Sequence, residues 1–193
     1  STLVDDGVAE EKEEEVEDTV EEDEEEVITF STEPALVKDI TTDELGSAPD
    51  NLISINDVVY FVAESLEYGK ELWKSDGTSG GTSLFKDIYA GASSSSPAGL
   101  LDVNGTLFFS ATEGTNGVEL WKSTGSPAGT TLVKDIYAGA TGSTPTYLFN
   151  YKNTLFFAAT TAANGHELWK SNGTAAGTLL VKDIYPGATS SGI

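Results

Sequence analysis

The side chains that could do chemistry in this sequence are few, and they recur at a fixed interval. An aspartate follows a lysine at four places that lie 48 residues apart, namely Asp39, Asp87, Asp135 and Asp183. Carboxylates act as general acids or bases when a partner group lies within hydrogen-bonding reach. Each copy has one such carboxylate and no histidine or cysteine beside it. We therefore interpret these aspartates as structural, in a repeated cross-strand ion pair or a loop-anchoring hydrogen bond, with Lys74, Lys122 and Lys170 or the adjacent glutamate positions as partners, and we expect no enzyme.

The only histidine offers no catalytic or metal site. His166 stands at a position that is Lys70 and Val118 in the equivalent segments, so we interpret it as a variable surface residue. The chain contains no cysteine, so zinc would lack its usual soft ligands. Any metal would be a hard cation that binds oxygen.

Calcium is the one cofactor to consider, because it takes oxygen ligands from loops. The candidate ligands are Asp76, in an Asp-Gly-Thr turn, and three residues of an acidic run, Glu22, Asp23 and Glu24. Thr124 and Asn172 replace Asp76 in the equivalent segments. A hydrogen-bonded turn accommodates Asp, Asn and Thr alike, and it is the favoured interpretation of that position.

The charge is concentrated at one end of the chain. Residues 1–33 hold 16 of the 32 Asp and Glu residues and one lysine, so we divide the chain into an acidic tail, 1–33, and a remainder, 34–193. Such a composition favours disorder, although residues 27–30 could add a strand. All ten basic residues are lysines and none cluster, which argues against nucleic-acid binding. No run of about 18 apolar residues is present, so we expect no membrane span.

A strict internal repeat organises the rest of the chain. The sequence Glu-Leu-Trp-Lys-Ser occurs three times, and a Lys-Asp-Ile element with an apolar residue before it occurs four times, always 48 residues apart. Short apolar runs with aromatic residues lie between these elements, at 59–63, 107–111 and 155–159. Neither alternate face of these runs is polar, which is typical of strands buried on both sides.

One unit is expected to contain four strands, near residues 100–103, 106–111, 118–123 and 131–136. Asn104-Gly105 between the first two strands is typical of a two-residue hairpin turn. The equivalent turns are Asn56-Asp57 and Lys152-Asn153. Four strands in about 40 to 50 residues is the size of a propeller blade. The predicted fold is all-β, with three 48-residue propeller-type blades and one surplus strand.

Six aromatic residues recur at two positions of the repeat, and we assign them to its core: Trp73, Trp121, Trp169, Phe61, Phe109 and Phe157. Aromatic side chains supply a large buried area, which favours this assignment. A carbohydrate-binding row of the three tryptophans is the alternative.

The segment Glu-Leu-Trp-Lys-Ser-Asp-Gly-Thr at 71–78, followed by Gly81-Thr82, resembles the repeat of the ELWxxDGT family of large secreted bacterial proteins. The resemblance covers residues 35–193 and departs from the pattern at 124–126 and 172–174. It implies a propeller-like, extracellular and non-enzymatic module.

Three blades would not close a ring, so unit faces and strand edges would remain open for pairing. We therefore expect an extracellular or cell-surface structural protein, a fibre or sheath subunit that binds copies of itself through exchange of a terminal strand. The donor is either Leu180, Val181, Lys182, Asp183 and Ile184, or the N-terminal copy with Leu36, Val37 and Ile40. The alternative is a fragment of a longer secreted propeller that serves adhesion and binds a glycan or calcium.

Overall fold

The structure is a computed structural model that describes residues 34–41 and 46–188. Apart from Pro34, the described residues all belong to one compact unit, Ala35–Ile193. The acidic tail lies outside the described residues, and with it the strand expected at 27–30 and the calcium candidates Glu22, Asp23 and Glu24. All strands described below belong to this unit.

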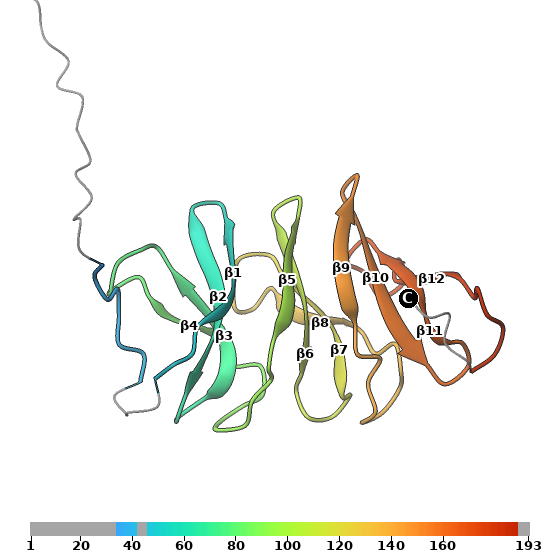
Figure 1. Cartoon of the computed structure of the whole chain (residues 1–193), viewed down its shortest axis with the longest axis horizontal. Helices are drawn as coiled ribbons and strands as arrows, with labels where there is room; N and C mark the ends of the chain where they lie inside the picture. The colour runs from blue at the N-terminus through green and yellow to red at the C-terminus, as the bar shows by residue number, and fades with distance from the viewer. Residues whose placement is uncertain (1–33, 42–45, 189–193) are drawn as a thin grey trace, which may run out of the picture. The chain divides into compact units, whose positions relative to one another are not determined.

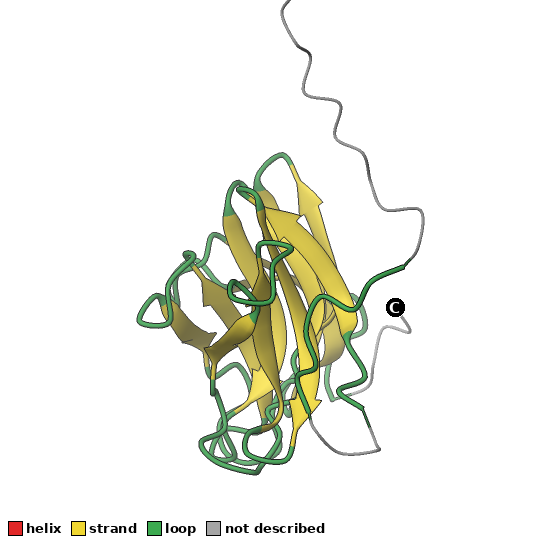
Figure 2. Cartoon of the chain, turned by 90° about the vertical axis from the view of Figure 1, so that its left-hand side faces the viewer, coloured by secondary structure: helices red, strands yellow, loops and turns green. Residues whose placement is uncertain are grey.

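The compact unit consists of three antiparallel four-stranded sheets, and no helix is present among the described residues (Figures 1 and 2). The first sheet contains β1 (Asp50–Ile55), β2 (Val58–Ser65), β3 (Gly69–Ser75) and β4 (Ser83–Lys86). The second contains β5 (Ala98–Val103), β6 (Thr106–Thr112), β7 (Val118–Ser123) and β8 (Thr130–Lys134). The third contains β9 (Thr146–Tyr151), β10 (Thr154–Thr161), β11 (Gly165–Ser171) and β12 (Leu179–Lys182). In each sheet the strands are paired in chain order, which confirms the all-β expectation and the four strands of each unit.

The first two strands of every sheet are joined by the hairpin turn that the sequence predicts. Asn104 and Gly105 both have positive φ, 54° and 78°, as a two-residue turn of this kind requires. Asn56-Asp57 and Lys152-Asn153 adopt the same conformation without glycine. The position of the turn is therefore conserved in the repeat even where its most favourable residue is missing.

The second strand of the middle sheet is buried on both faces. Phe108 packs into a cluster shared with the third sheet, whereas its neighbour Phe109 packs into a cluster shared with the first sheet. Successive side chains of a strand point to opposite faces, so two adjacent aromatic residues fill two different cores. This confirms that the apolar run at 107–111 lies between neighbouring units.

The same core is built twice, 48 residues apart. Trp121 packs with Phe109 between the first two sheets, and Trp169 packs with Phe157 between the second and third. Trp73 and Phe61 form a smaller cluster on the outer side of the first sheet. All six aromatic residues assigned to the core are buried, so that prediction is confirmed.

The surplus strand was wrongly predicted. Residues 36–40, the first copy of the Lys-Asp-Ile element, form no strand, and the last copy is β12, which pairs with β11 of its own sheet. In every complete unit this element pairs with the preceding Glu-Leu-Trp strand. The first copy has no such strand before it in the described residues. The three sheets do not close into a ring, as expected for so few units.

Replacing Trp121 with alanine is expected to lower the free energy of unfolding by about 3–5 kcal/mol, because the side chain is 8% exposed and fills the first inter-sheet core. Urea unfolding followed by circular dichroism measures the change. Leu52→Ala is the control, since Leu52 is exposed and its loss should change stability by less than about 0.5 kcal/mol. Equal effects of the two substitutions would contradict the core role of Trp121.

Candidate assembly surface

Each sheet buries one face against the sheet that follows it, and it does so with six apolar positions. On the first sheet these are Ile53, Ile55, Tyr60, Leu72, Phe85 and Ile88, which pack against the second sheet. On the second sheet the residues 48 positions later do the same against the third: Leu101, Val103, Phe108, Leu120, Val133 and Ile136. All twelve side chains are buried or half-buried. The repeat therefore specifies a docking face as well as a fold.

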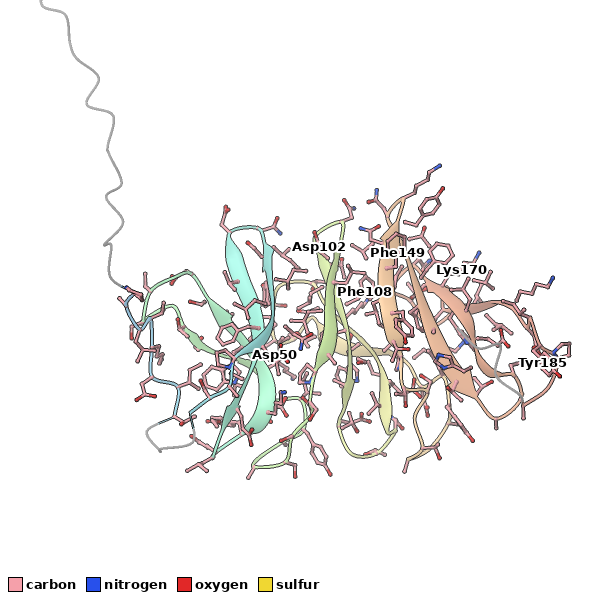
Figure 3. All side chains as sticks on the ribbon, viewed as in Figure 1. Asp50, Asp102, Phe108, Phe149, Lys170 and Tyr185 are labelled. Atoms are coloured by element: carbon pink, nitrogen blue, oxygen red, sulfur yellow. The ribbon has the colours of Figure 1, made fainter. Side chains whose placement is uncertain are left out.

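The third sheet carries the same six positions, and no further sheet of the described residues packs against them. They are Phe149, Tyr151, Phe156, Leu168, Val181 and Ile184, and we call this set the C-terminal face. Phe149 is 62% exposed and Ile184 57%, whereas Phe156 and Leu168 are half-buried. Tyr185, which follows Ile184, lies at the far end of the array in Figure 3 and is exposed as well. Apolar residues remain at every position, although four of the six are exposed.

A strained aromatic residue borders the C-terminal face. Tyr147 has φ of 54°, a conformation that a bulky side chain rarely adopts, and it is exposed. The equivalent residues Asn51 and Gly99 tolerate positive φ far better, and each lies at an irregularity in the pairing of the first strand. Tyr147 lines a shallow hollow of about 340 Å³ together with Phe149, Phe156 and Leu168. The strain is maintained at the rim of an open apolar surface, as strained residues often are at functional sites.

Lysine side chains join neighbouring sheets. Lys122 on β7 donates to the carbonyl of Gly173 at 2.7 Å, and Lys134 on β8 donates to the carbonyl of Thr178 at 2.9 Å. Both acceptors belong to the turn between the last two strands of the third sheet. Lys170 and Lys182 occupy the equivalent positions beside the C-terminal face. That face therefore carries the cations, as well as the apolar groups, with which one sheet binds the next.

A buried glutamate holds the segment that leaves each sheet. Glu71 is fully buried on β3, and its carboxylate accepts hydrogen bonds from the backbone N–H groups of Ile88, Tyr89 and Ser95 and from the Ser95 hydroxyl, at 2.6–3.3 Å. Because Ile88 is one of the six docking positions, the carboxylate fixes part of the docking face as well as the loop to the next sheet.

The second and third sheets repeat this arrangement. Glu119 accepts from Tyr137 N and from the backbone and hydroxyl of Ser143. Glu167 accepts from Ile184 N at 3.2 Å, which places an apolar residue of the C-terminal face. Ser191, the repeat equivalent of Ser95 and Ser143, lies outside the described residues.

Sequence reasoning missed these glutamates. We interpreted the glutamates of the Glu-Leu-Trp strand only as ion-pair partners, although an acidic residue that recurs inside a mostly buried strand indicates a specific role. Burial raises the pKa of Glu71 and of Glu119, while the hydrogen bonds from the loop act in the opposite direction.

The predicted turn at Asp76 is confirmed. The Asp76 carboxylate accepts from the backbone and hydroxyl of Thr78 at 2.9 and 2.7 Å, and these bonds lower its pKa. Asn172 makes the same two contacts to Thr174. Among the described residues, no three His, Cys, Asp or Glu side chains converge as metal ligands.

Two of the four recurring aspartates anchor loops. Asp87 accepts from the N–H of Gly91, and Asp183 accepts from the Asn164 side chain. This agrees with the loop-anchoring alternative, while the lysines described above bind carbonyl groups. His166 is half-buried on β11, and its Nδ1 lies 3.0 Å from the Thr160 hydroxyl.

The comparisons with known proteins assign no family. No protein-family model matches the chain, and a search of the curated proteins finds no significant match. Across residues 34–41 and 46–188, no helix has the length and apolar character needed to cross a membrane.

The raised pKa values of Glu71 and Glu119 predict how stability depends on pH. A carboxyl group whose pKa is higher in the folded state favours folding when protonated. Its contribution is complete below the unfolded pKa of about 4.3 and is lost as the pH rises through the folded value. The free energy of unfolding of the wild type, relative to that of a Glu71→Gln/Glu119→Gln variant, should therefore rise as the pH falls from 7 to 5.

Urea titrations at several pH values measure this difference, because groups common to both proteins cancel. Glu64→Gln, which alters an exposed glutamate, should leave the pH dependence unchanged. A difference that shrinks on acidification would mean that the hydrogen bonds to the carboxylates outweigh their desolvation.

Proposed function

We propose that this protein is an extracellular structural protein, a subunit of a fibre or sheath that assembles with copies of itself through the ends of its repeat array. The observation that carries the proposal is the C-terminal face. Six positions that are covered inside the array keep apolar residues at its end, four of them exposed. Contiguous apolar surface of this kind on a folded protein marks an interaction site.

We further propose that each sheet is a propeller-type blade. In support, β1 contacts β5 and β5 contacts β9, so the first strands of successive sheets are neighbours. The three sheets stack in chain order, each with its first strand beside that of the next (Figure 1). A propeller brings its innermost strands together in this way, around a central axis.

Assembly through such an end is directional. The surface that binds differs from the surface that is bound, so the contact is heterologous, and it gives filaments unless the rotation between subunits closes a ring. The terminal segment 180–184 contributes Val181 and Ile184 to the C-terminal face, and we propose that it contacts the neighbouring subunit while β12 stays paired with β11. The extracellular location rests on the resemblance to ELWxxDGT repeats.

The alternative is a fragment of a longer adhesion protein that binds glycan or calcium. In that case a further repeat of the same polypeptide covers the C-terminal face, and the isolated chain of 193 residues remains a monomer. The two proposals therefore differ in the oligomeric state of the purified protein.

Two substitutions on one strand test the assembly proposal. Val181→Asp places a carboxylate where Val133 is buried within the array, whereas Leu179→Asp alters the position of the exposed Thr131. Both side chains are about half exposed in the single chain, 43% and 48%, so both variants should fold. Val181→Asp should raise the concentration at which oligomers form by about tenfold or more, since burying an unpaired carboxylate is unfavourable.

Sedimentation velocity over a range of concentrations, with electron microscopy of the same samples, measures the effect. Leu179→Asp should assemble like the wild type. A wild-type protein that stays monomeric at every concentration, or two variants that behave alike, would refute the proposed role of the C-terminal face.

A further inference from the structure

Residues 35–41, which we call the strap, cover part of the outer side of the first sheet. Ile40 packs there against Phe61, Ala63 and Trp73. Forty-eight residues later, Ile88 packs with Phe109, Ala111 and Trp121, and Ile136 does the same on the third sheet. The strap thus stands where the end of a preceding sheet stands on the second and third sheets.

A hydrogen bond also shows that the strap occupies the place of the end of a preceding sheet. Lys38 in the strap donates to the carbonyl of Thr82 at 2.7 Å. This pair lies 96 residues before the pair of Lys134 and the Thr178 carbonyl, and the separation along the chain is 44 residues in both. The strap makes this inter-sheet contact although it is not a strand.

The strap covers the first sheet incompletely. On the second sheet, Tyr89 packs so closely over Gly114 that a Cβ atom there would lie 2.3 Å from the tyrosine ring. The equivalent pair on the first sheet is Thr41 and Leu66, and Leu66 is 76% exposed. A cavity of about 230 Å³, lined by Ile40, Thr41, Leu66 and Trp73 among others, lies where the tyrosine ring would fit.

Other positions on the outer side of the first sheet also lack their cover. Leu52 is exposed, whereas its equivalents Leu100 and Leu148 are packed against the neighbouring sheet. Val59 is only partly buried, whereas its equivalents Leu107 and Leu155 are buried. The first sheet therefore has a partly filled binding surface for the end of a preceding sheet.

The C-terminal face has the groups that this surface lacks. Ile184 and Tyr185 stand at the repeat positions of Ile40 and Thr41, so an exposed tyrosine is available where the strap has threonine. Lys182 corresponds to Lys38 and could donate to Thr82. Lys170 corresponds to Lys122, whose acceptor Gly173 has its equivalent in Gly77. The two surfaces are thus complementary in the apolar pattern used at both inter-sheet cores and in the lysine contacts found between the second and third sheets.

We infer that the C-terminal face binds the first sheet of a second copy of this chain, and that the second copy's strap is displaced in the process. Displacement is required because Lys38 and Lys182 would bind the same carbonyl and Ile40 and Ile184 would occupy the same site. The strap is then an internal competitor that limits assembly until another copy replaces it. This inference rests on the proposed function and specifies its partner surface and register.

Cross-linking tests the register. The chain has no cysteine, so Tyr185→Cys and Leu66→Cys can be made as separate proteins, mixed, and treated with a short bis-maleimide. Both positions are exposed in the single chain, so neither substitution should prevent folding. The mixture should give a covalent dimer that neither protein gives alone. Leu179→Cys mixed with Leu66→Cys is the matched control, and it should react several-fold less.

Weakening the strap tests the competition. Ile40→Ala should lower the concentration for half-assembly by about tenfold, since the strap loses much of its apolar contact while the incoming face is unchanged. The double variant Ile40→Ala/Val181→Asp distinguishes specific assembly from non-specific association of the uncovered first sheet. If assembly uses the C-terminal face, the second substitution should abolish the increase in assembly that Ile40→Ala causes.

The outcomes distinguish the inference from the proposed function. If Val181→Asp blocks assembly but the 185–66 cross-link does not form and Ile40→Ala has no effect, the proposed function stands and this partner surface is wrong. If Ile40→Ala lowers the concentration for half-assembly and still does so in the presence of Val181→Asp, the inference is overturned as well. If the wild type never assembles, the proposed function fails.

Discussion

A buried carboxylate connects each sheet to the next. In the Glu-Leu-Trp strand the glutamate is enclosed among apolar neighbours, and it satisfies the backbone N–H groups of the segment that leaves the sheet. A buried charge is tolerated only where hydrogen bonds compensate it, so the loop and the glutamate require each other. The segment therefore leaves each sheet along one path, and Ile88 is delivered to the core shared with the second sheet. Stacking of the sheets depends on this local arrangement.

In each unit, the strand that builds the fold also supplies the apolar residues of both docking faces. Phe108 and Phe109 serve opposite cores because they are adjacent in one strand. A sequence that repeats this strand must reproduce both faces, including the outward face of the last sheet. Repetition contributes to the apolar residues there. It does not account for Tyr147, which replaces asparagine and glycine in a conformation that suits those residues and disfavours tyrosine.

Much of the fold could be predicted from the sequence because its signals are local. Asn104-Gly105 predicted a hairpin turn, and the strict spacing of Trp73, Trp121 and Trp169 predicted the length of the repeating unit. The strap was mispredicted for a reason that is not local, since Leu36–Ile40 has the residues of a strand but, among the described residues, no partner strand to pair with. The role of the glutamates was missed because most of their donors are backbone N–H groups, as many as 24 residues away, and the serine hydroxyls that also donate lie in loops. The candidate surface could be found only by comparing exposure at equivalent positions.

Sheets that touch only their neighbours unfold as a one-dimensional array does. The middle sheet is packed on both faces, whereas the third sheet shares a core with one neighbour and the first has only the strap on its outer side. In such arrays stability is the sum of unit terms and interface terms, so opening begins at the ends. Backbone amides of β6 and β7 should consequently be the slowest to exchange with solvent, and those of β12 among the fastest of the strands. A subunit that gains a neighbour would exchange as an interior unit does.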